Sequence, residues 1–76
     1  MLVVYSINDC KWCEIIKKML TENGIDYEEK NVMESRENKV ELAERVNYSK
    51  EVKFPVVCKD SECVMGANIP KIKGLF

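Results

Sequence analysis

The chain has 76 residues, of which 46% are hydrophobic and 33% charged, and its formal net charge is −1. A chain of this length buries only about 60% of its unfolded surface, so we expect one thin core and a single domain over residues 1–76. Lysine and arginine are scattered among acidic residues, which argues against nucleic acid as a partner. The longest apolar run is too short to span a membrane, and residues 1–5 lack the charged segment and cleavage site of a signal peptide. We therefore expect a cytoplasmic monomer that has no membrane partner.

The first part of the chain predicts a strand, a helix and a second strand. Residues 2–7 are apolar and β-branched, which is typical of a buried strand. Residues 11–23 predict a helix that ends at Gly24, because their apolar side chains recur on one face. These side chains are Trp12, Ile15, Ile16, Met19 and Leu20. Residues 25–32 alternate loosely and predict the second strand, which completes a βαβ unit with a right-handed crossover.

A second helix is predicted to begin after Ser35, whose hydroxyl is a good N-cap, and to run to about residue 46. Its expected apolar face consists of Val40, Leu42, Ala43 and Val46. Asn47 is the expected stop, and residues 48–53 are expected to form a polar connection.

The last part of the chain predicts a hairpin and a short terminal helix. Residues 54–58 and 63–65 read as strands joined by a turn at 59–62. Residues 68–76 are long enough for only a short helix, which is predicted to have Asn68 as its cap and a proline in its first turn. The element order β-α-β-α-β-β-α predicts an α/β fold with a four-stranded mixed sheet, strand order 2-1-3-4, and helices on both faces.

The segment Cys10-Lys11-Trp12-Cys13 carries the chemistry that the sequence indicates most strongly. The chain contains no histidine, which excludes Cys/His nucleophile pairs. Cys10 lies where a strand ends and a helix begins, and there the free N–H groups and the helix dipole favour a thiolate. The positive charge of Lys11 also favours the thiolate of Cys10, whereas the negative charge of Asp9 disfavours it. Cys13, one turn later, is placed to displace a substrate from Cys10, so the pattern indicates two-step thiol–disulfide exchange with Trp12 beside the substrate.

Phe54-Pro55 is the second motif of interest. Proline in a sheet is confined to edges, bulges and the first residue of a strand. One interpretation is a trans proline that opens the strand. The other is a cis proline beside the CxxC segment, which leaves a backbone edge free to pair with a substrate.

Four segments together resemble the glutaredoxin family over nearly the whole chain. They are Tyr5-Ser6, Cys10-Lys11-Trp12-Cys13, Phe54-Pro55-Val56-Val57 and Met65-Gly66. The resemblance implies a thioredoxin-like fold and dithiol reductase activity, with Cys10 as nucleophile, Cys13 as resolving thiol and Pro55 as a cis proline. The substrate-binding residues that it implies are Lys11, Trp12, Phe54, Pro55, Gly66 and Ala67.

The chain departs from the family where glutathione is usually held. Ile7 stands in place of a lysine, Ala67 replaces the second glycine of a Gly-Gly turn, and residues 68–70 lack the usual acidic residue. Lys11 and Trp12 replace proline and tyrosine. We expect no bound cofactor, and either glutathione or a thioredoxin-reductase-type enzyme as electron source. The expected partners are that reductase and a disulfide-bearing protein or small-molecule substrate.

Cys58 and Cys63 face each other across the hairpin if its turn centres on residues 60–61. They either form a reducible cross-strand disulfide or remain buried small hydrophobic residues. Together with Cys10 and Cys13 they also resemble a four-cysteine zinc site, so a metal-binding or metallochaperone module is the main alternative. A redox-inert interaction domain is a third possibility. The regular helix pattern directly after Cys13 argues against zinc.

Overall fold

The computed structural model describes residues 2–46 and 52–75. The elements follow in the order β1 (Leu2–Ser6), α1 (Lys11–Glu22), β2 (Tyr27–Asn31), α2 (Arg36–Arg45), β3 (Val56–Lys59), β4 (Glu62–Met65) and α3 (Ile69–Lys73). This order confirms the prediction, with element ends displaced by a few residues. The expected stop at Asn47 and most of the expected polar connection, residues 48–51, lie outside the described residues.

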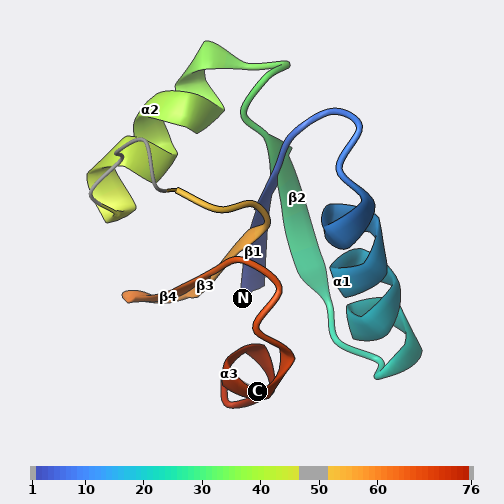
Figure 1. Ribbon diagram of the computed structural model, residues 1–76. Coiled ribbons are helices and arrows are strands. Elements are labelled where there is room, and N and C mark those ends of the chain that lie inside the picture. Colours follow the sequence, from blue (N-terminus) through green and yellow to red (C-terminus); the bar gives the residue numbers. More distant parts are fainter. Residues whose placement is uncertain (1, 47–51, 76) are drawn as a thin grey trace.

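The four strands form one mixed sheet with the order β2-β1-β3-β4, as predicted (Figure 1). Strand β1 runs parallel to β2 and antiparallel to β3, and β4 returns antiparallel to β3. Tyr5 pairs with Val56, so the beginning of β3 lies at the carboxyl end of β1. The segment that precedes β3 and the segment that follows β1 therefore meet at one edge of the sheet.

Helices cover both faces of the sheet, with α1 and α3 on one face and α2 on the other (Figure 1). The side chains buried beneath α1 and α3 are Leu2, Val4, Ile16, Leu20, Val57, Ile72 and Leu75. Those buried on the α2 face are Val3, Tyr5, Val32, Leu42, Val56 and Cys58. Because alternate residues of β1 and β3 supply the two clusters, both central strands are buried on each side.

The predicted apolar face of α2 was wrong in part. Leu42 is fully buried and Val46 packs against the same cluster, whereas Val40 is 50% exposed and Ala43 is also exposed. The four side chains belong to two competing helical stripes, one through residues 40 and 43 and one through 42 and 46. The structure buries the stripe that contains leucine, which removes the larger apolar side chain from water.

The hairpin is shorter at its base and tighter at its turn than predicted. Strand β3 begins at Val56, so Phe54 and Pro55 precede the strand instead of opening it. The strands extend to Lys59 and Glu62, which leaves a two-residue turn in which Asp60 adopts a φ of 55°. No helix within residues 2–46 and 52–75 is long and apolar enough to cross a membrane.

Candidate active site

Cys10 occupies the N-cap position of α1, where the sequence predicted it. Its backbone is extended (φ −108°, ψ 101°), and its Sγ accepts a hydrogen bond of 3.1 Å from the backbone N–H of Cys13. The Cys10 carbonyl accepts the first intrahelical bond from Glu14. The sulfur thus accepts the N-cap hydrogen bond that a serine or aspartate oxygen accepts at other helix starts. The positive end of the helix dipole points at it.

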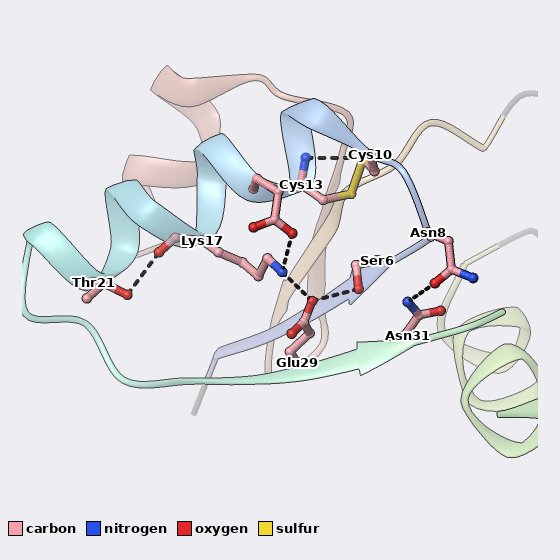
Figure 2. Close-up of polar contacts among 9 residues, drawn as sticks. Ser6, Asn8, Cys10, Cys13, Lys17, Thr21, Glu29 and Asn31 are labelled. Atoms are coloured by element: carbon pink, nitrogen blue, oxygen red, sulfur yellow. Dashed lines mark hydrogen bonds and ion pairs between the residues drawn. A yellow bond between two sulfur atoms is a disulfide. The ribbon is translucent and has the colours of Figure 1, made fainter. Parts of the chain in front are cut away.

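The loop that delivers Cys10 to this position is held by β2 and the residues after it. Asn31 Nδ2 donates to Asn8 Oδ1 at 2.9 Å (Figure 2). The backbone N–H of Asn8 donates to Met33 Sδ at 3.4 Å, a contact on the solvent side of the loop. Asp9 then takes a φ of 53°, which turns the chain from β1 into α1. Sequence reasoning missed Asn8 and Asn31, because the predicted pairing of β1 with β2 does not give the register that brings these two residues together.

Cys13 lies one helical turn after Cys10 and is 1% exposed. The two sulfur atoms form a disulfide, with the Cα atoms 5.2 Å apart (Figure 2). Cys10 is partly exposed, so the accessible sulfur of the pair is the one at the helix end. This asymmetry of exposure is what a nucleophile and a resolving thiol need.

Lys11 and Trp12 occupy the first turn of α1 and are both exposed. Trp12 is 54% exposed, an unusual degree for the largest apolar side chain in the protein. An aromatic surface therefore adjoins the disulfide, with a lysine next to it.

Phe54, Pro55, Gly66 and Ala67 come together at the same edge of the sheet. The Phe54–Pro55 peptide bond is cis, which agrees with the second interpretation of this motif. The Gly66 N–H donates to the carbonyls of Lys53 and Pro55, both at 2.9 Å. Gly66 adopts a φ of +79°, a conformation that favours glycine. The turn after β4 is thus tied to the segment before β3, at the end of β1 from which Cys10 follows.

A polar network fastens α1 to the sheet next to Cys13 (Figure 2). Lys17 Nζ donates to Glu29 Oε2 (2.6 Å) and to Glu14 Oε1 (2.8 Å), and the buried Ser6 hydroxyl donates to Glu29 (3.0 Å). The hydrogen bond from Lys17 lowers the pKa of Glu29. Burial alone would lower the pKa of Lys17, but its two carboxylate partners outweigh burial and raise it. The network joins α1, β1 and β2 within about one turn of the disulfide.

Sequence reasoning also missed this network. Its bonded partners are 12 and 23 positions apart in the sequence, except for the Glu14–Lys17 pair on one helix. Only that i,i+3 pair is visible as a local pattern. Finding the rest requires the register of β1 against β2, in which Val4 lies opposite Glu29.

Cys58 and Cys63 form a second disulfide, with Cα atoms 4.1 Å apart and the two residues directly opposite in the β3–β4 register. The four cysteines are thus divided between two separate bonds on different elements. Within the described part of the chain no group of three or more cysteine, aspartate or glutamate side chains is arranged to hold a metal ion. The arrangement does not favour the four-cysteine metal site.

A four-stranded mixed sheet with helices on both faces and a CxxC disulfide at the start of α1 defines a thioredoxin-like redoxin. The model of the Glutaredoxin family matches residues 2–64, and the chain belongs to that family. Family membership supports a thiol–disulfide oxidoreductase, since glutaredoxin-like proteins generally act on disulfide substrates together with reductases.

Individual relatives agree with this assignment. The chain is 29% identical over 76 residues to a glutaredoxin-like 8.6 kDa protein in the rubredoxin operon of Clostridium pasteurianum, covering 100% of this chain and 97% of that protein. Among solved structures, the thioredoxin-like protein BC3987 is 32% identical with a TM-score of 0.86 and full coverage of both chains. The glutaredoxin-like NrdH-redoxin from Escherichia coli is 25% identical with a TM-score of 0.80, covering 99% of this chain and 93% of that one.

Proposed function

We propose that the protein reduces disulfides in a protein or small-molecule substrate, with Cys10 as nucleophile and Cys13 as resolving thiol. The observation that carries this proposal is the placement of Cys10 Sγ at the N-terminus of α1, where it accepts the Cys13 N–H at 3.1 Å. In the reduced protein the same N–H and the helix dipole favour the thiolate of Cys10 over its thiol.

The reaction proceeds in two exchanges. The Cys10 thiolate attacks one sulfur of the substrate disulfide, so that a Cys10–substrate bond forms as the substrate's own S–S bond breaks. The released substrate thiolate takes up a proton from water. Cys13 then loses its proton and attacks Cys10 Sγ, which releases the second substrate thiolate and closes the Cys10–Cys13 disulfide. Two electrons pass to the substrate in each cycle.

We propose that the substrate lies against the surfaces around the disulfide. Exposed Trp12 supplies an apolar contact and Lys11 a positive charge. The segments at Phe54-Pro55 and Gly66-Ala67 flank the other side. Pro55 directly precedes β3 and Gly66 directly follows β4, so the backbone of both segments lies at the end of the sheet. An extended substrate segment can pair with this backbone.

We propose that a reductase dithiol, rather than glutathione, regenerates the protein. Ile7 is partly buried against the α2-side cluster and offers no charge for a carboxylate. Asn68 Oδ1 accepts the Lys71 N–H at 3.4 Å as the cap of α3 and carries no charge for an amine. The related NrdH-redoxin is described as having a thioredoxin-like activity profile, which agrees with a reductase as electron source.

The activity is tested with a Cys10→Ser variant in an insulin-disulfide reduction assay with dithiothreitol as reductant. We expect activity to fall to the background of dithiothreitol alone, because serine is not a nucleophile toward disulfides. The control is Glu22→Gln, an exposed residue at the far end of α1, which leaves both cysteine pairs intact and is expected to retain turnover. Undiminished activity in Cys10→Ser contradicts the proposal.

The electron source is tested separately on the oxidised wild-type chain. NADPH consumption is followed with thioredoxin reductase in one arm and with glutathione plus glutathione reductase in the other. We expect faster regeneration in the first arm. Equal or faster regeneration in the glutathione arm contradicts a reductase as the preferred donor without affecting the roles of Cys10 and Cys13.

A further inference from the structure

The exchange mechanism uses Cys10 and Cys13 and leaves the Cys58–Cys63 disulfide unexplained. This bond joins β3 to β4 at directly opposite positions, with Cα atoms 4.1 Å apart. It encloses only residues 59–62, the end of the hairpin. Strand β4 is the last strand in the sheet order and pairs with β3 alone among the described strands.

The two sulfurs differ in their surroundings. Cys58 is fully buried on the α2 face of the sheet, in the cluster that contains Val3, Tyr5 and Leu42. Cys63 lies on the edge strand and is partly exposed. Cys63 packs against the same cluster but is the more exposed residue of the pair, whereas Cys58 is covered on all sides by protein. Attack by a thiolate from solution is therefore expected at Cys63.

The bond also lies close to the segments proposed to hold substrate. Cys58 is three residues after Pro55, and Cys63 is three residues before Gly66. Two further strand pairs, Val57 with Val64 and Val56 with Met65, separate the disulfide from the hydrogen bond that the Gly66 N–H donates to the Pro55 carbonyl. The crosslink thus fixes the register of the two strands whose ends carry Pro55 and Gly66.

We propose that Cys58 and Cys63 are a second thiol–disulfide site, which takes small-molecule thiols and disulfides and whose oxidation holds the Pro55 and Gly66 segments together. A thiolate such as that of glutathione attacks Cys63 Sγ, forms a mixed disulfide and displaces Cys58, which is protonated. A second thiol attacks the mixed disulfide on the sulfur of the first and restores the Cys63 thiol. The small molecule leaves as its disulfide, and two electrons have entered the hairpin.

This site is expected to exchange more slowly than the first. Opening requires Cys58 to depart into an apolar cluster, where a thiolate is poorly stabilised and hence a poor leaving group. Reclosing is favoured, because the two residues stay opposite each other on paired strands. The link between this site and substrate binding rests on the proposed function, whereas the redox exchange of Cys58 and Cys63 does not.

The first experiment isolates the couple in a Cys10→Ser/Cys13→Ala variant, in which serine keeps a good N-cap and alanine fills the buried position. The variant is equilibrated in mixtures of reduced and oxidised glutathione, alkylated and weighed by mass spectrometry. We expect the number of alkylated cysteines to change from two to none across the mixtures. The control is Cys58→Ala/Cys63→Ser, in which only the first pair titrates. Two free thiols in every mixture, or a bond that survives the most reducing one, overturns the proposal.

The second experiment measures amide hydrogen exchange at Gly66 in the same variant, oxidised and reduced. Reduction is expected to speed exchange of the Gly66 N–H by at least about tenfold, because the crosslink no longer limits local opening of β4. Amides in the middle of α1 serve as the internal control and are expected to exchange unchanged. An equal Gly66 rate in both states overturns the coupling to the hairpin. Neither readout depends on the disulfide reductase activity of Cys10 and Cys13. Both experiments therefore test the Cys58–Cys63 site even if the proposed function is wrong.

Discussion

The Tyr5 hydroxyl and the Glu41 carboxylate meet on the α2 side of the sheet, away from the disulfides. Tyr5 donates to Glu41 Oε2 at 2.6 Å, and Lys30 Nζ contacts both carboxylate oxygens at 2.7 Å. These hydrogen bonds, that of Lys30 foremost, lower the pKa of Glu41. Burial, together with the bond to Glu41, raises the pKa of Tyr5 well above its ordinary value. The three side chains join α2 to β1 and β2 through charge-assisted bonds.

We predict that Glu41→Gln lowers the free energy of unfolding by about 1 kcal/mol at pH 7, a modest value because the carboxylate is partly exposed. The folded-state pKa of Glu41 is depressed, so its contribution is fully present above the ordinary carboxyl pKa and is lost as pH falls through the folded value. The difference between the variant and the wild type should therefore shrink at pH 3. Urea unfolding at both pH values measures it.

The matched control is Glu44→Gln, which removes an exposed carboxylate from the same helix. It is expected to change stability by less than about 0.5 kcal/mol. A Glu41→Gln effect that is as large at pH 3 as at pH 7 contradicts the electrostatic account and indicates lost packing instead.

At the scale of elements, Gly66 does more than end β4. Its φ of +79° is unfavourable for other residues, yet a Cβ there would meet Lys53 Cβ at 3.5 Å, an ordinary contact. Gly24, at the end of α1, has a φ of +68° and open space around it. The two glycines therefore share the backbone constraint and differ in position, since Gly66 adjoins Pro55 and Gly24 lies at the far end of α1.

We predict that Gly66→Ala and Gly24→Ala each destabilise the protein by about 1 kcal/mol, because both force alanine into the left-handed region. Only Gly66→Ala is expected to raise KM for a disulfide substrate, since it displaces the turn beside Pro55. Thermal unfolding and steady-state kinetics measure the two effects. An equal change of KM in both variants contradicts a substrate-binding role for Gly66.

The element scale also shows where sequence patterns stop being sufficient. The helix start at Cys10 and the caps at Ser35 and Asn68 were predictable, because a cap depends on residues within one turn. The buried face of α2 was not, because its two apolar stripes are nearly equal and the packing against β1 and β3 decides between them. The isomer at Phe54–Pro55 likewise depends on neighbouring segments that the local sequence does not reveal.

At the scale of the whole molecule, the strand order follows from a βαβ unit joined to a hairpin, which is why it was predictable. The polar contacts that connect distant elements were not, since Lys17–Glu29 and Tyr5–Glu41 each require the strand register. The candidate site likewise has one part that the sequence predicts and one part that depends on the fold. The disulfide partners lie three residues apart, whereas the meeting of Pro55 with Gly66 is a consequence of the hairpin.

We predict that Leu42→Ala costs about 2–5 kcal/mol, because Leu42 is the one buried side chain among the residues described for α2. In a domain of this size each kcal/mol lowers Tm by about 4–8 °C, so the loss is large. Val40→Ala on the same helix is the matched control, and its half-exposed side chain predicts a change below about 1 kcal/mol. Calorimetry measures the stability of both variants. Equal losses at the two positions would contradict the observed orientation of α2.

The most direct test of the central claim is to trap the first exchange with a Cys13→Ser variant. This variant is reduced, freed of reductant and mixed with a small-molecule disulfide, and its peptides are analysed by mass spectrometry without reduction. We expect a mixed disulfide on Cys10 that persists because no resolving thiol remains. Formation of the adduct only on Cys58 or Cys63, or no adduct on Cys10, would contradict the assignment of Cys10 as the nucleophile.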